Sequence, residues 1–158
     1  MKEADAVIVG ARCAGCTLAL ALARHGWDMV LIDRDALPSE TVSTHLIFPN
    51  TLARLSELGA LAPLLAAHEV PMLDFRIFGL GQEIAGSFTP IDGFDQAAAP
   101  RRIALDNAIL DTALAAGADG RFGQRVVDLI GSGTPEDPVA GVVLEAIGHF
   151  EVDWRDCD

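Results

Sequence analysis

The sequence is poor in positive charge. Among its 158 residues, 11 are Lys or Arg and 23 are Asp or Glu, so the formal net charge is −12 at pH 7. A surface of that sign repels phosphate backbones and anionic lipid headgroups over a Debye length of roughly 8 Å. The scarcity of cations therefore argues against binding to nucleic acid or to a membrane surface.

The sequence also has no long uncharged stretch and no cysteine framework. The absence of a charge-free run of about 18 residues argues against a transmembrane segment. Three cysteines are an odd number, which is atypical of a secreted, disulfide-linked domain. Glu3 and Asp5 stand where a signal peptide would be basic. We therefore expect a single-domain cytoplasmic protein that starts at Met1.

The most informative segment lies near the N-terminus. An apolar, β-branched run meets Gly10, an Ala- and Leu-rich helix is expected from about Cys13 to His25, and a second strand ends in Asp33. Buried parallel strands are nearly continuously apolar, and the N–H groups at the start of the following helix face an anion. Asp33 would then accept hydrogen bonds from a ribose hydroxyl. This pattern predicts a dinucleotide-binding βαβ unit.

The glycine fingerprint of such a unit, G-x-G-x-x-G, is altered here. Gly10 and Gly15 occupy the first and third positions, whereas Arg12 replaces the second glycine, which normally lets the pyrophosphate approach the backbone. We expect the Arg12 side chain to swing away from the pyrophosphate, from where its guanidinium can still screen a phosphate charge. A plain βαβ unit without a ligand is the alternative.

Beyond the βαβ unit, the spacing of apolar residues changes from the helical pattern to strand-like alternation and back to the helical pattern. The pattern predicts helices at about 49–58 and 61–68, a β-hairpin over 72–88, a loop over 91–100, a helix from Arg102 to about 116, and strands at 121–130 and 139–144. Such a hairpin does not belong to a parallel sheet. It is therefore expected to be an insertion.

Four short motifs, each present once, are found along the chain. They are Gly-Ala-Arg-Cys-Ala-Gly at 10–15, Asp33-Arg34, Thr-Val-Ser-Thr-His at 41–45, and Arg101-Arg102 followed by Leu105. Together they resemble the N-terminal part of FAD-dependent monooxygenases and reductases, the group that includes p-hydroxybenzoate hydroxylase, geranylgeranyl reductase and the flavin-dependent halogenases. The resemblance covers about residues 4–145.

This resemblance implies FAD as the cofactor, NAD(P)H as the cosubstrate that reduces it, and a small-molecule substrate. Asp33 and Arg34 would lie at the adenosine ribose, Arg102 would reach the pyrophosphate, Val127 would offer backbone groups to the adenine, and His45 would lie near the flavin ring. The resemblance identifies no catalytic side chain. The ADP half would lie on the loop formed by Gly10, Ala11, Arg12, Cys13, Ala14 and Gly15.

The expected fold is thus α/β: a Rossmann-like βαβ sheet that binds FAD or NAD(P), with a small antiparallel β-hairpin insertion, in an incomplete domain. Family members are usually more than twice as long, and their later Gly-Asp segment is not found after Val139. Within one FAD-binding domain, 1–158, we assign 1–46 to the nucleotide-binding core, 70–100 to the insertion that starts a substrate region, and 101–145 to the return to the nucleotide domain.

Two rival interpretations remain at this stage. The chain could be a non-catalytic fragment that binds an adenine dinucleotide. Alternatively, Cys13 and Cys16 form a C-x-x-C at a helix N-terminus, where a thiolate is stabilised, and the chain would then be a thiol–disulfide redox protein. We expect both cysteines to pack as small apolar side chains instead. We expect no metal site, because zinc would need two further ligands.

Overall fold

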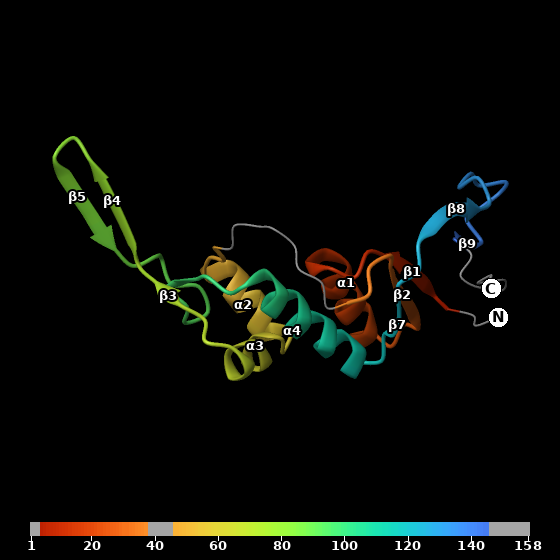
Figure 1. Ribbon diagram of the computed structural model, residues 1–158, viewed down its shortest axis with the longest axis horizontal. Helices are drawn as coiled ribbons and strands as arrows, with labels where there is room; N and C mark the ends of the chain where they lie inside the picture. The colour runs from red at the N-terminus through yellow and green to blue at the C-terminus, as the bar shows by residue number, and fades with distance from the viewer. Residues whose placement is uncertain (1–3, 38–45, 146–158) are drawn as a thin grey trace. The chain divides into compact units, whose positions relative to one another are not determined.

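The computed structural model describes residues 4–37 and 46–145 (Figure 1). The chain divides into two compact units. One contains Met1–Ser39 and Ile109–Asp158, and the other contains Glu40–Ala108. Helix α4 (Arg102–Ala115) belongs partly to each, because the boundary between the units falls within it.

The first unit is built on a parallel sheet. Strands β1 (Ala6–Val9), β2 (Met29–Asp33) and β7 (Asp119–Phe122) lie in the order β1-β2-β7. Both pairings are parallel, and every residue of the central strand β2 is buried. A strand covered on both faces must be apolar throughout, which explains its sequence Met-Val-Leu-Ile up to the terminal acid. The predicted α/β fold with a parallel βαβ core is confirmed.

Two elements cover this sheet. Helix α1 (Cys13–Arg24) connects β1 to β2 and packs against both strands. The helix is followed by Gly26, whose φ of +78° is the left-handed conformation expected after a helix end. On β2, Val30 and Ile32 form a buried cluster with residues of β9 (Gly141–Leu144). Because side chains alternate across a strand, this cluster lies on one face of the sheet and the intervening Leu31 lies on the other.

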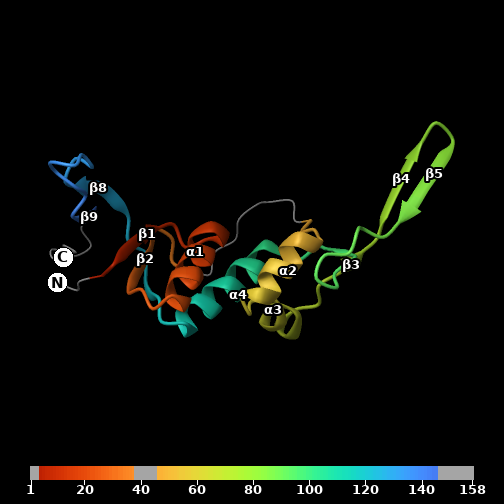
Figure 2. The same ribbon diagram turned by 180° about the vertical axis from the view of Figure 1, so that it is seen from behind.

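The second unit contains helices, a short strand pair and a hairpin. Its helices, besides the start of α4, are α2 (Pro49–Glu57) and α3 (Leu61–Ala67). Its strands are β3 (Met72–Leu73), β4 (Phe75–Gly79), β5 (Gln82–Gly86) and β6 (Ala97–Ala98). Strands β4 and β5 form the predicted antiparallel hairpin, which both views show as an extended ribbon (Figure 2).

The structure corrects three predictions made from the sequence pattern. The expected single strand at 121–130 is two strands, because Gly123 turns the chain with φ +72° between β7 and β8 (Val126–Ile130). Strand β8 pairs antiparallel with β9 and takes no part in the parallel sheet. The hairpin begins at Phe75, not at Met72, because Met72 and Leu73 pair with Ala98 and Ala97. Those two alanines lie in the segment expected to be a loop.

The hairpin exposes four large apolar side chains. Ile77, Phe78, Leu80 and Ile84 are 58%, 70%, 103% and 61% exposed. None of the helices in the described ranges is long and apolar enough to cross a membrane. Within the same ranges, no group of three or more His, Cys, Asp or Glu side chains could hold a metal ion.

Candidate functional site

The turn between β1 and α1 depends on two glycines. Gly10 has a φ of +103°, and its N–H donates a 2.7 Å hydrogen bond to the carbonyl oxygen of Ile32 on β2. A Cβ atom added at residue 15 would lie 1.8 Å from the carbonyl oxygen of Gly10 and 3.2 Å from Cγ2 of Ile8. The start of α1 therefore lies so close to the end of β1 that residue 15 has no room for a side chain. This is the close helix–strand packing that the third glycine of a dinucleotide fingerprint permits.

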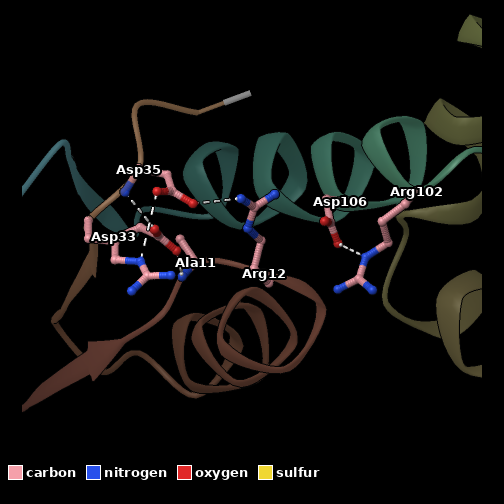
Figure 3. Close-up of polar contacts among 7 residues, drawn as sticks. Ala11, Arg12, Asp33, Asp35, Arg102 and Asp106 are labelled. Atoms are coloured by element: carbon pink, nitrogen blue, oxygen red, sulfur yellow. Dashed lines mark hydrogen bonds and ion pairs between the residues drawn. The ribbon is translucent and has the colours of Figure 1, made fainter. Parts of the chain in front are cut away.

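Arg12 fits this turn although a glycine is usual at its position. Its backbone has φ −103° and ψ −168°, an extended conformation that any residue adopts. The Arg12 guanidinium is directed to Asp35, with Nη2 3.0 Å from the carboxylate oxygen Oδ2 (Figure 3). The side chain thus has a partner within the protein. Whether it also screens a phosphate stays a prediction.

Asp33 ties the end of β2 to the glycine turn. Its Oδ2 accepts a 2.7 Å hydrogen bond from the buried N–H of Ala11, and its Oδ1 accepts a 2.9 Å hydrogen bond from the N–H of Asp35 (Figure 3). Asp33 is only 7% exposed. Each carboxylate oxygen has two acceptor sites, so each retains one for a ligand hydroxyl. Asp33 is therefore oriented by backbone donors and remains able to hold a ribose.

Arg34 and Asp35 continue the chain beyond Asp33. The Arg34 side chain is 74% exposed, and its Nε lies 3.9 Å from Oδ1 of Asp35. This long, exposed contact leaves the guanidinium mobile enough to approach an anionic ligand. The predicted position of Arg34 beside the ribose site is compatible with this geometry.

A cleft of about 250 Å³ opens where the parallel strands end. Ligands of open α/β sheets bind outside the carboxyl ends of their strands, and this cleft lies at that edge. Asp33 and Gly10, both predicted from the sequence, line it. The lining residues are Val9, Gly10, Ile32, Asp33, Arg34, Gln124, Arg125 and Val126.

Gln124 carries an unusual polar atom in this region. Its Oε1 is buried and accepts no hydrogen bond from any residue that the structure describes. Buried polar atoms are nearly always hydrogen-bonded in native proteins. The turn at Gly10 and Gly15, the Asp33 carboxylate and the Gln124 amide oxygen together fit a bound nucleoside that has hydroxyl and amino donors.

The remaining predicted residues are placed differently. Val127 is 52% exposed on β8, whereas its neighbour Val126 lines the cleft. His45 and the motif at 41–45 lie outside the described residues. Arg102 lies in the second unit, where its Nε donates a 2.8 Å hydrogen bond to Oδ1 of Asp106 (Figure 3). Because Asp106 is only 4% exposed, it orients the Arg102 side chain at the start of α4.

Six residues of the site were not predicted as site residues from the sequence. They are Asp35, Val9, Ile32, Gln124, Arg125 and Val126. The last three follow the third parallel strand, so their position could have been found only by recognising the break at Gly123. The carboxylate two residues after Asp33 was a signal that could have been used.

The geometry weakens the thiol–disulfide interpretation. Cys16 is completely buried and Cys13 is partly buried. A reactive thiol pair must be accessible to its substrate disulfide. Cys16 instead packs in the core on the buried face of α1, as expected for a small apolar side chain.

Comparisons with known proteins agree with this architecture. A family model described as "FAD binding domain" matches residues 3–143. A squalene epoxidase of Gibberella zeae is 32% identical over 98 residues, which are 62% of this chain and 19% of that protein. The tRNA 5-methylaminomethyl-2-thiouridine biosynthesis bifunctional protein MnmC of Ralstonia nicotianae is 32% identical over 150 residues, which are 85% of this chain and 21% of that protein.

Solved structures show the same fold. The myxobacterial chondrochloren halogenase CndH, described as a variant of FAD-dependent halogenases, matches with a TM-score of 0.80 and 22% identity over 98% of this chain and 36% of its own. A 2-methyl-3-hydroxypyridine-5-carboxylic acid oxygenase matches with a TM-score of 0.69 and 25% identity over 96% of this chain and 38% of its own. The chain thus spans about a fifth of these curated relatives and little more than a third of these structures. Its glycine turn, its oriented Asp33 and the family match over nearly its whole length together show that the chain belongs to the FAD binding domain family.

Proposed function

We propose that this chain holds the adenosine half of FAD in the cleft at the ends of β1 and β2, as part of an FAD-dependent oxidoreductase of the monooxygenase or reductase type. The observation that carries the proposal is the buried carboxylate of Asp33. Two backbone N–H groups orient it, and it lines a cleft at the carboxyl edge of a parallel sheet. Membership of the FAD binding domain family supports FAD as the ligand.

Each residue of the site then has a specific task. Asp33 accepts hydrogen bonds from the adenosine ribose, while the N-terminal N–H groups of α1 face the pyrophosphate. Gly15 allows the close approach of helix and strand on which this position depends. Arg102, oriented by Asp106, is the proposed cation for the pyrophosphate. When bound, FAD supplies the hydride transfer or oxygen activation that no protein side chain provides.

NAD(P)H as the cosubstrate and a small molecule as the substrate complete the proposal. The similar proteins support the substrate class, since they include a squalene epoxidase and an oxygenase of a pyridine carboxylic acid. A cytoplasmic location is proposed from cysteine usage. Monooxygenation, reduction and halogenation all remain within the proposed class.

A second candidate function is nucleotide binding without turnover. The exposed apolar side chains of the β4–β5 hairpin favour it for this chain acting alone, because flavin oxygenation requires exclusion of water and these side chains are open to solvent. The two candidates share the same site. They differ in whether the cofactor is reduced and used.

The identity of the ligand provides the test. The purified chain is incubated with equal concentrations of FAD and NAD, desalted and denatured, and the released nucleotide is identified by mass spectrometry. We expect FAD to be recovered, with flavin absorbance in the sample before denaturation. Recovery of NAD alone, or of no nucleotide, would overturn the proposal.

A further inference from the structure

Gln124 is held beside the ribose-binding carboxylate by its own backbone. Its N–H donates a 3.0 Å hydrogen bond to the carbonyl oxygen of Asp33, and the preceding N–H, of Gly123, donates a 3.1 Å hydrogen bond to the carbonyl oxygen of Asp35. These two bonds join the segment after β7 to the segment after β2. Gln124 is thereby placed next to Asp33, among the residues that line the cleft.

The side-chain amide of Gln124 lacks a donor for its oxygen. Oε1 is buried, and among the described residues no N–H or O–H group donates a hydrogen bond to it. Leaving such an acceptor unsatisfied costs free energy that a ligand donor would recover. The terminal torsion of a glutamine is broad, so the amide can turn toward a donor in the cleft at little cost.

The surroundings of the amide limit what that donor can be. Two apolar residues with accessible side chains, Val9 and Val126, line the same cleft and suit the flat face of a base. The ribose hydroxyls already have Asp33 as their acceptor. The base attached to that ribose must lie nearby, and the exocyclic amino group of adenine is the donor that it offers. Glutamine is also a side chain that commonly recognises adenine through this group.

We propose that the Gln124 carboxamide accepts a hydrogen bond from the exocyclic amino group of the adenine base and thereby selects adenine at this site. The proposal rests on the proposed function, since it requires an adenine nucleotide in the cleft. It adds a side chain that determines base specificity to a site in which the backbone of Val127 is the expected contact of the adenine.

The test compares two ligands that differ by one amino group. ADP and purine riboside 5′-diphosphate, which lacks the 6-amino group, are titrated calorimetrically against the chain and against Gln124→Met, a variant of similar shape without the acceptor. We expect the unaltered chain to prefer ADP by about tenfold and Gln124→Met to prefer it by about twofold or less, the scale of one hydrogen bond. Gln124→Glu keeps an acceptor of the same length and should retain the preference.

Controls separate the possible outcomes. Gln82→Met makes the same change on the exposed strand β5 and should leave the preference unaltered. Thermal unfolding followed by circular dichroism establishes that each variant is folded. If the unaltered chain binds neither diphosphate, the proposed function fails. If it prefers ADP and folded Gln124→Met keeps that preference, or if it binds both ligands equally, the role of Gln124 is overturned while nucleotide binding stands.

Discussion

The Oδ2 atom of Asp33 accepts a 2.7 Å hydrogen bond from the backbone N–H of Ala11, 22 residues earlier in the chain. This bond links the end of β2 to the glycine turn that follows β1. The acid that is predicted to hold the ribose and the loop that is predicted to hold the pyrophosphate are therefore parts of one hydrogen-bonded unit. A change at either residue should alter both the folding and the binding of this unit.

Substitution of Asp33 by Asn tests this link. Asn keeps the shape but replaces one acceptor oxygen with an NH2 group, so one of the two backbone donors loses its partner. We expect FAD binding to weaken by about 1–3 kcal/mol, with a loss of stability of similar size. Fluorescence titration with FAD and urea unfolding measure the two effects. Asp28→Asn, an exposed change just before the same strand, is the control, and equal behaviour of both variants would contradict the prediction.

Enlarging Gly15 should separate α1 from β1. A Cβ at this position would lie 1.8 Å from the Gly10 carbonyl oxygen, which is backbone and cannot move aside without displacing the turn. We expect Gly15→Ala to lower the free energy of unfolding by about 1–3 kcal/mol, the usual cost of overpacking, and Gly15→Val to abolish FAD binding.

A matched glycine provides the control for this effect. At Gly79, no atom of the described residues other than Gly79 and its two chain neighbours lies within 4 Å of the position that a Cβ would take. Gly79→Ala should change the free energy of unfolding by no more than about 0.5 kcal/mol. Comparable unfolding curves for Gly15→Ala and Gly79→Ala, together with unchanged FAD affinity, would show that the close approach is not required.

Restoring the usual glycine at residue 12 should be tolerated. The Arg12 and Asp35 side chains are 23% and 45% exposed, so their ion pair contributes only about 0–1 kcal/mol. We expect Arg12→Gly to raise the Kd for FAD by no more than about threefold, which corresponds to about 0.7 kcal/mol of binding free energy. Titration with FAD measures it. A loss of more than tenfold would instead assign the guanidinium a direct role in holding the cofactor.

The pair of Arg102 and Asp106 should couple strongly. Asp106 is buried and lies 2.8 Å from Nε of Arg102, one helical turn away. We expect Asp106→Asn to reduce stability by about 1–3 kcal/mol, and its effect to be much smaller when Arg102 is already Met. Urea unfolding of the single and double variants gives the coupling. Asp111→Asn, exposed on the same helix, is the control, and purely additive effects would refute the pairing.

The 158-residue chain assayed alone should oxidise NADPH without forming product. Four apolar side chains of the β4–β5 hairpin are exposed, and shielding from water is what protects reactive intermediates in flavin chemistry. With FAD, NADPH and aromatic or isoprenoid test substrates, we expect any NADPH consumed to appear as hydrogen peroxide, at a rate close to that of free FAD. Stoichiometric formation of a hydroxylated or reduced product would contradict this expectation.

Much of the βαβ unit could be predicted from the sequence because its signals are local. The apolar run of β1, the helix stop at Gly26 and the acid at the end of β2 each reflect the conformation or burial of neighbouring residues. The spacing of Gly10, Gly15 and Asp33 indicates a strand, a helix and a second strand in that order. These residues do converge in the structure, although the roles assigned to them stay predictions.

The far side of the cleft was decided only by tertiary structure. Periodicity over 121–130 does not reveal that β7 joins the parallel sheet while β8 turns away to pair with β9, because both segments are equally strand-like. Nor does it show that Met72 and Leu73 pair with Ala98 and Ala97, which lie 26 and 24 residues further on. Pairing of this kind depends on which distant segment offers a complementary edge and buried face, and that choice is made by packing.

The amino-acid sequence by itself thus determined the fold class, the glycine turn and the ribose acid, since each follows from the conformational limits of short segments. Only the tertiary structure decided that Asp33 is oriented by Ala11 and Asp35, and that Gln124 lines the same cleft with an unsatisfied amide oxygen. Those contacts join residues separated by up to 91 positions (33 to 124). Their geometry exists once the sheet has brought the ends of its strands together.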